Sequence, residues 1–366
     1  MIYLDNGSTT RPYKQVVEFI SQSMEQDFFN PSSLHGGGLL MENKLKRAKE
    51  TFLELLGQSG DFYFTSGGTE SNNLAILGSL GPKKHIITTK AEHPSVLRVI
   101  DRQKSQGYKV DYVQTDKYGT VLEDSLEQLL TPETGLVSLM DTNNELGTTQ
   151  DLDRIGSIIK ERSEAVFHVD AVSSFGKRPL QSSTVDVLTI SSHKIHGPQG
   201  VGGIFVKSGT RIKPLFFGGG QQNKVRPGTE FTIGALAFTL AASMAYKDME
   251  KNLTHVQTLH NKIVKLPLEN IAVNSPSNAL PYILNISFLG TKGQVLVNAL
   301  SAEGIYISTG AACNERSDNL LKTLGHEKDV YEGAVRISFS HSNTLNEMDI
   351  VIAALIKAVN MIRTRI

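Results

Sequence analysis

Two hydrophobic patterns alternate along the chain between residues 60 and 207. Short runs rich in β-branched and aromatic residues are typical of strands, and apolar residues spaced three and four apart are typical of helices. The predicted strands are 61–65, 85–89, 108–113, 136–140, 165–169, 185–190 and 203–206. The predicted helices between them are 70–80, 95–106, 122–130 and 152–162. This alternation indicates crossover connections and a largely parallel sheet, with ligands at the carboxyl ends of the strands.

The pattern changes after residue 228. An apolar-periodic segment at 233–250 predicts a helix that leaves the first unit. The elements predicted beyond it are a helix near 253–265, strands near 271–274, 283–288, 305–308 and 335–339, and an amphipathic helix at 345–362. Strands and helices in this order indicate a smaller α+β domain.

The amino-acid composition limits the kinds of ligand and binding partner that we expect. The 366 residues, 40.0 kDa, are enough for two domains or one large α/β unit that can bury a cofactor. Lys plus Arg equals Asp plus Glu at 37 each, so we expect a small specific ligand, with no direct nucleic acid or membrane partner. The chain begins without a basic and apolar leader, which favours a soluble, cytoplasmic protein. A single cysteine excludes an internal disulfide, and we expect no metal site.

A lysine stands at the end of one predicted buried strand. Residues 188–203 read LTISSHKIHGPQGVGG, an apolar run followed by small polar residues, Lys194 and a glycine-rich turn. A lysine held there loses solvation, so its pKa falls and its amine can attack an aldehyde cofactor. The segment resembles the Schiff-base lysine site of pyridoxal-phosphate enzymes of aminotransferase class V, in particular the NifS/IscS cysteine desulfurase branch.

Other chemistry-bearing residues also follow predicted strands. Residues 64–73 read FTSGGTESNN, and glycines at a helix N-terminus favour a phosphate. From the residues alone, His93 could be structural and Asp170 could cap the next helix. The resemblance implies that Gly68 and Thr69 bind the cofactor phosphate, that His93 stacks on the pyridine ring and moves protons, and that Asp170 keeps the ring nitrogen protonated.

The resemblance assigns further cofactor contacts. It implies that Asn144, in the run NNELG, contacts the cofactor ring, and that Ser191 and His193 reach the phosphate. The run GGGQQNKVRPGT at 218–229 resembles a segment that crosses a dimer interface, where Thr229 binds the phosphate of the neighbouring subunit. An obligate homodimer with shared sites is therefore expected. Ser173 departs from the family, which usually has a glutamine that bonds the cofactor phenolic oxygen.

The substrate end of the expected site involves an arginine and the only cysteine. A guanidinium can hold a carboxylate through two hydrogen bonds, and the resemblance gives this role to Arg336, with Asn144 beside it. Cys313 lies in the run STGAACNERS, which fits the family's Ser-x-Gly-x-Ala-Cys motif of the long-loop type. In that motif the thiol takes sulfur from the substrate and becomes a persulfide. The interval from Cys313 to Arg336 is a few residues shorter than in typical long-loop members. The opening segment DNGSTT departs from the commoner DNAATT.

Together these features predict a fold-type I pyridoxal-phosphate enzyme with a large domain, 14–250, built on a mainly parallel seven-stranded sheet. The small α+β domain, 1–13 and 251–366, carries the cysteine loop. The predicted activity converts L-cysteine to L-alanine with Lys194, His93 and Cys313 as catalytic residues. The sulfur would pass to a protein acceptor such as an iron-sulfur scaffold or a tRNA-thiolation protein. The alternatives are a selenocysteine lyase, a cystine C–S lyase, an aminotransferase, or an inactive dimer that scaffolds sulfur-transfer partners.

Overall fold

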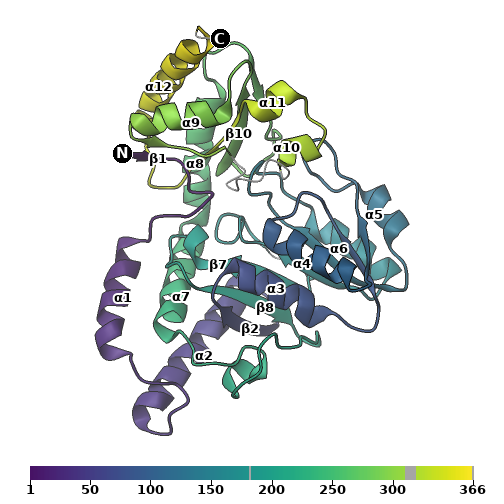
Figure 1. Ribbon diagram of the computed structural model, residues 1–366. Coiled ribbons are helices and arrows are strands. Elements are labelled where there is room, and N and C mark those ends of the chain that lie inside the picture. Colours follow the sequence, from purple (N-terminus) through teal and green to yellow (C-terminus); the bar gives the residue numbers. More distant parts are fainter. Residues whose placement is uncertain (181–182, 310–318, 365–366) are drawn as a thin grey trace.

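A seven-stranded sheet forms the centre of the larger part of the molecule (Figure 1). The computed structural model describes residues 1–180, 183–309 and 319–364. The strand order is β2-β8-β7-β6-β5-β3-β4, and β8 alone runs antiparallel to its neighbours. The strands are β2 Gly60–Thr65, β3 His85–Thr88, β4 Lys109–Tyr112, β5 Thr134–Met140, β6 Val166–Asp170, β7 Val187–Ser191 and β8 Gly202–Lys207. The predicted α/β fold with a mainly parallel seven-stranded sheet is confirmed.

Helices cover both faces of this sheet. The four predicted crossover helices are present as α3 Gly68–Ser79, α4 Pro94–Ser105, α5 Glu123–Leu129 and α6 Leu152–Arg162. Helices α3 and α4 cover one face, and α5 and α6 cover the other, where their apolar residues share a cluster with those of α1 Lys14–Gln26, α2 Gly36–Leu56 and α7 Thr232–Lys247. The sequence pattern did not predict α1 and α2. No side chain caps α1 at Tyr13, and α2 begins with three glycines, the weakest helix formers after proline. Packing of their apolar faces stabilises both helices instead.

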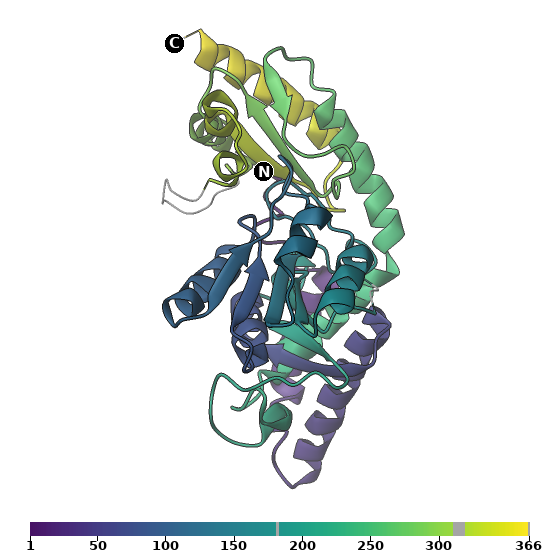
Figure 2. The ribbon, with the colours of Figure 1, turned by 90° about the vertical axis from the view of Figure 1, so that its right-hand side faces the viewer.

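The smaller part of the molecule is built on a three-stranded antiparallel sheet of order β12-β10-β9. Its elements are α8 Met249–Val264, β9 Ile271–Val273, β10 Ile283–Phe288, α9 Gly293–Ala302, α10 Leu320–Thr323, α11 Lys328–Glu332, β12 Ala334–Ser338 and α12 Leu345–Arg363. Only Asp248 separates α7 from α8, and this pair of helices runs between the two parts (Figure 2). The predicted strand 305–308 is shorter, as β11 Ile305–Tyr306, and pairs with the N-terminal β1 Ile2–Tyr3 rather than with the three-stranded sheet. The first residues of the chain therefore belong beside its last third.

The two largest apolar clusters correspond to these two parts. One extends from Val16 to Ala245 and fills the space around the large sheet. The other joins Ile2 and Leu4 to residues 256–362. The division into domains 14–250 and 1–13 with 251–366 stays a prediction, which these clusters support. Within the described ranges, no helix is both long and apolar enough to span a membrane.

Candidate active site

The ends of the parallel strands bring most of the predicted site residues together. Asp170 is the last residue of β6, Lys194 follows β7, and Asn144 follows β5. His93 follows β3 and directly precedes α4. Because parallel strands end at the same edge of a sheet, side chains distant in sequence meet there.

Lys194 has the environment of a nucleophilic amine. A short 3-10 turn, Ser192–Lys194, directs the chain away from β7, and Nζ donates to the backbone oxygen of Gly7. Burial and, to a smaller extent, the charge of Arg336 lower the pKa of Lys194 to about 8, while Asp5 and Asp170 act in the opposite direction. An amine with a lowered pKa is neutral more often near neutral pH, and only the neutral amine attacks an aldehyde.

The side chain of Asp170 is held in place at the end of β6. Its Oδ1 accepts from the Val172 backbone N–H at 3.0 Å, and its Oδ2 accepts from Asn72 Nδ2 at 2.8 Å. Two donors hold the carboxyl group in a fixed orientation. The sequence did not single out Asn72. The only available signal was its position one turn after Gly68 on α3, which is too common to indicate a role.

A cavity of about 410 Å³ lies at the N-terminus of α3 and is lined by the 66–70 turn, Ser191 and His193. Gly67 has φ of 150°, which a glycine adopts readily, and it offers α3 no side-chain cap, so free backbone N–H groups point outwards. Ser191 Oγ is buried without a hydrogen-bond partner among the described residues. His193 Nδ1 lies 3.1 Å from Thr9 Oγ1, and burial together with Lys194 lowers its pKa to about 4. Uncommitted donors beside a helix N-terminus suit a phosphate group.

Arg336 reaches the site from β12 in the smaller part. Its side chain is almost fully buried, and its Nη1 donates to the backbone oxygen of Asn144 at 2.9 Å. Nη2 donates to Asp5 Oδ1 at 2.8 Å and to Ser8 Oγ at 2.7 Å. Nε has no partner in the described part of the chain, so this N–H is left for a ligand carboxylate. The resemblance assigned no role to Ser8, although the run DNGSTT departs from the family at that position.

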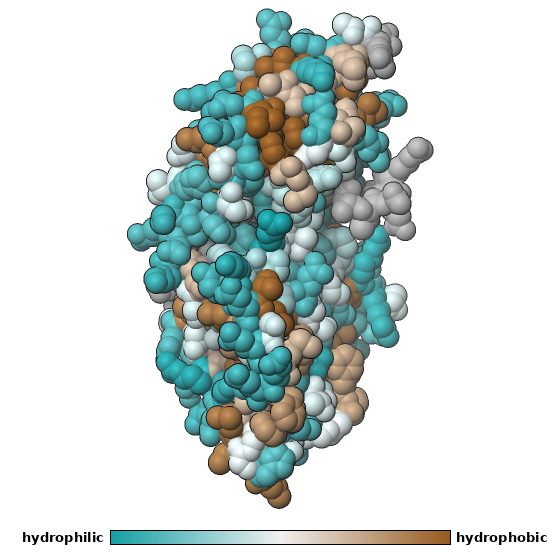
Figure 3. All heavy atoms as spheres, turned by 90° about the vertical axis from the view of Figure 1, so that its left-hand side faces the viewer, coloured by the Kyte–Doolittle hydropathy of each residue, from teal (hydrophilic) through white to brown (hydrophobic). Residues whose placement is uncertain are grey.

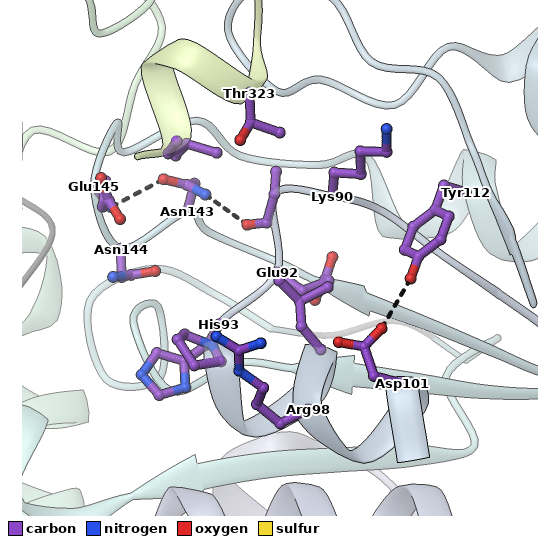
Figure 4. Close-up of a pocket in the computed structure, with 14 residues that line it drawn as sticks. Lys90, Glu92, His93, Arg98, Asp101, Tyr112, Asn143, Asn144, Glu145 and Thr323 are labelled. Atoms are coloured by element: carbon purple, nitrogen blue, oxygen red, sulfur yellow. Dashed lines mark hydrogen bonds between the residues drawn. The ribbon is translucent and has the colours of Figure 1, made fainter. Parts of the chain in front are cut away.

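A second cavity, of about 320 Å³, opens beside His93 and Asn144 (Figure 4). Glu145 lies on the same wall as Asn144, and Tyr112 with Asp101 lies across from them. Burial raises the pKa of Glu145 to about 7, although Arg336 opposes the shift. This cavity extends from the expected cofactor side of the site towards α10, whose first residue directly follows Asn319.

Three of the predicted site residues lie apart from this cluster or outside the described residues. Thr229 is exposed and lines neither cavity. Ser173 is buried in the turn after β6, and no described residue forms a hydrogen bond with its hydroxyl in the structure. Cys313 lies outside the described residues. The long-loop type predicted for its segment therefore stays a prediction.

These features together define the chemical class of the site. An amine with a lowered pKa, a charged carboxylate close to it and a phosphate-sized cradle together suit an aldehyde cofactor that carries a phosphate. The chain belongs to the aminotransferase class V family, whose model matches residues 2–351. Pyridoxal phosphate is the cofactor of this family, and the donors around Ser191 and the amine of Lys194 fit it.

Individual relatives agree with the family assignment. The chain is 35% identical to "Cysteine desulfurase IscS" of Methanosarcina thermophila, covering 99% of this chain and 93% of the relative. It is 38% identical to "NifS/IcsS protein homolog" of Lactobacillus delbrueckii subsp. bulgaricus, covering 97% and 96%. A solved structure described as "NIFS-LIKE PROTEIN" superposes with a TM-score of 0.93 at 34% identity, covering 98% of this chain and 99% of that one.

Proposed function

We propose that the chain is a pyridoxal-phosphate-dependent cysteine desulfurase that converts L-cysteine to L-alanine and holds the sulfur on Cys313. The observation that carries this proposal is the convergence of the Lys194 amine, the Asp170 carboxylate and the Arg336 guanidinium at one edge of the sheet. The relatives named as cysteine desulfurases cover nearly the whole chain, which supports the same reaction.

The large-sheet residues would hold the cofactor. Ser191, His193 and the N-terminus of α3 at Gly68 and Thr69 would bind its phosphate, and Asp170 would face its ring nitrogen. When bound, pyridoxal phosphate supplies an aldehyde for the lysine amine and a ring that withdraws electrons from the substrate α-carbon. Lys194 then serves as the base near that carbon, because its lowered pKa leaves a fraction of the amine neutral.

The smaller part would bind the amino-acid end of the substrate. Arg336 Nε–H is available for a carboxylate, and the bonds to Asn144 and Asp5 keep the guanidinium from turning. An amino acid held at its carboxylate has its α-carbon and side chain in a fixed position relative to Lys194.

Cys313 supplies the group that distinguishes a desulfurase from other members of the family. In the sulfur-transfer step the Cβ–S bond of the substrate breaks and a bond forms between that sulfur and Cys313 Sγ. The products are L-alanine and a persulfide on Cys313, so no external oxidant or reductant is consumed. A protein acceptor, such as an iron-sulfur scaffold or a tRNA-thiolation protein, would then take the sulfur.

Replacing Cys313 with alanine tests this function against the alternatives. Since removing a nucleophile commonly costs several orders of magnitude, alanine formation from cysteine should fall by at least roughly a hundredfold. The spectral change on adding cysteine should remain, which controls for cofactor and substrate binding. Near-normal turnover in the variant would refute the persulfide step and favour a lyase, which needs no loop thiol. Absence of any visible cofactor absorption in the wild type would favour the inactive scaffold.

We also propose that the protein is a homodimer with shared sites. Phe216, Phe217 and Phe231 are exposed on either side of Thr229, and Leu34 is fully exposed before α2. The space-filling view shows further apolar side chains at the lower end of the face that carries α1 (Figure 3). Exposed apolar groups of this size are typical of protein interfaces.

The segment that carries Thr229 is firmly attached to the rest of the subunit. Gln222 exchanges two hydrogen bonds with the backbone of Phe64, at 2.7 and 2.8 Å, and Arg226 bonds Glu70 at 2.8 Å. Thr229 can therefore be presented outwards to a partner subunit. Mixing Thr229→Ala with Lys194→Ala protein should form hybrid dimers in which one site lacks both lesions, so part of the activity returns. Cofactor binding by a strictly monomeric protein would refute the shared site.

A further inference from the structure

A chain of hydrogen bonds joins His93 to Asp170 through two residues that the proposed function does not use. Asn72 Nδ2 donates to Asp170 Oδ2 and to Ser95 Oγ, both at 2.8 Å. Ser95 Oγ in turn lies 2.8 Å from His93 Nδ1. Asn72 is buried on α3, and Ser95 is the second residue of α4. This series of hydrogen bonds therefore links the end of β3 to the end of β6 beside the expected cofactor site.

The chemistry of each group fixes the direction of these bonds. A carboxylate only accepts, so the Asn72 amide nitrogen must face Asp170, and the same nitrogen donates to Ser95 Oγ. The Ser95 hydroxyl, already accepting, directs its own hydrogen to His93 Nδ1. The backbone N–H of Ser95 also donates to Nδ1, at 3.1 Å, and this bond is the N-terminal cap of α4.

His93 Nδ1 thus accepts two hydrogen bonds and carries no hydrogen of its own. In a neutral imidazole the hydrogen must then be on Nε2. We propose that Asn72 and Ser95 are positioning residues that hold His93 as its Nε2–H tautomer and tie its ring to Asp170. The consequence for catalysis rests on the proposed function, whereas the tautomer itself does not.

The network determines whether His93 acts in the site as a hydrogen-bond donor or as a base. Protonation of Nδ1 would place a hydrogen against the Ser95 backbone N–H, which cannot turn away, and the positive end of α4 adds to this penalty. Desolvation lowers the pKa of His93, Asp170 raises it and Lys194 lowers it. Arg98 and Glu145 line the same cavity. His93 accordingly presents an N–H to bound ligands and acts as a donor, which leaves Lys194 as the base.

Nitrogen NMR of the full-length, cofactor-loaded protein labelled with ¹⁵N-histidine tests the proposal. The chain has 10 histidines, so His93→Gln identifies the signals of residue 93. The wild type should show the Nε2–H tautomer. In Ser95→Ala the neutral ring loses one donor, so the protonation constant of His93 should rise about fivefold, the usual worth of one neutral hydrogen bond. Ser95→Thr keeps the hydroxyl and should restore the wild-type titration.

Asn72→Ala should also raise the protonation constant, because the freed Ser95 hydroxyl can turn and accept from a protonated Nδ1. The double variant should rise no further than the larger single change, since both substitutions break the same chain. Ser105→Ala, at the other end of α4, is the matched control and should leave His93 unchanged. An Nδ1–H tautomer in the wild type, or a Ser95→Ala titration equal to that of the control, would overturn the proposal. A wild-type protein that shows the Nε2–H tautomer but forms no alanine from cysteine would count against the proposed function alone.

Discussion

Replacing Lys177 with methionine should stabilise the protein at neutral pH. Lys177 lies in the turn after β6 with 8% of its surface exposed, and its Nζ is 5.6 Å from the centre of the Tyr282 ring. Burial, with smaller contributions from the positive charges of Lys194 and Arg336, lowers its pKa from 10.5 to about 7. A group whose pKa is lowered by folding binds more protons in the unfolded state, so protonation favours unfolding.

The size of the effect follows from that shift. Between a folded pKa of about 7 and an unfolded value of 10.5, the cost at pH 7 is on the order of 4 kcal/mol. Methionine fills a similar volume but loses the cation–π contact, on the order of 1 kcal/mol, so the net gain is about 3 kcal/mol. As the pH rises towards the unfolded pKa the cost disappears. The gain should therefore fall to about 1 kcal/mol near pH 9.5.

Urea unfolding of the cofactor-free protein, at fixed protein concentration, measures this difference. The chain has no tryptophan, so far-UV circular dichroism is the suitable probe. Lys46→Met, at an exposed position on α2, is the matched control and should change the free energy of unfolding little at either pH. A Lys177→Met protein that is less stable than the wild type at pH 7, or a gain that does not shrink with rising pH, would refute the reasoning.

Four other perturbations probe the site. Ser8→Ala removes a 2.7 Å bond to Arg336, so KM for cysteine should rise about fivefold with kcat little changed, and an unchanged KM contradicts this role. Gly7→Ala should have a larger effect, because an added Cβ would lie 3.1 Å from Arg336 Cζ. Ser173→Gln should change the visible absorption of the bound cofactor or its pH dependence, and identical spectra would show that Ser173 already has an equivalent. Borohydride should attach the cofactor to Lys194, and peptide mapping to another lysine would disprove that assignment.

The sequence predicted those parts of the site that depend on short stretches of chain. Asp170 ends one buried strand and Lys194 lies shortly after the end of the next, and parallel strands place such residues at one edge whatever the rest of the fold does. Asn72 and Ser95 could not be found in this way. Their role depends on how α3 packs against α4, which no local pattern encodes.

The N-terminal segment shows the same limit over a longer distance. Asp5 and Ser8 contact Arg336, more than 300 positions away. They do so because β1 pairs with β11 and the residues after β1 bond directly to Ser338 of β12. Two-residue strands carry too few side chains for a period to be recognised. The pairing therefore follows from the folded smaller part and not from the sequence of the strand.

The first residues of the chain connect the substrate end of the site to the cofactor end. Asp5 and Ser8 bond Arg336 in the smaller part, while the Gly7 backbone oxygen accepts from Lys194 and Thr9 bonds His193 in the larger part. A substrate carboxylate bound at Arg336 Nε–H, as proposed, would place a second anion near Asp5, and the two anions would repel each other. Any displacement of Asp5 also moves Gly7, whose oxygen holds the Lys194 amine. We therefore expect carboxylate binding at Arg336 to weaken the hold on the Lys194 amine through the short segment from Asp5 to Gly7.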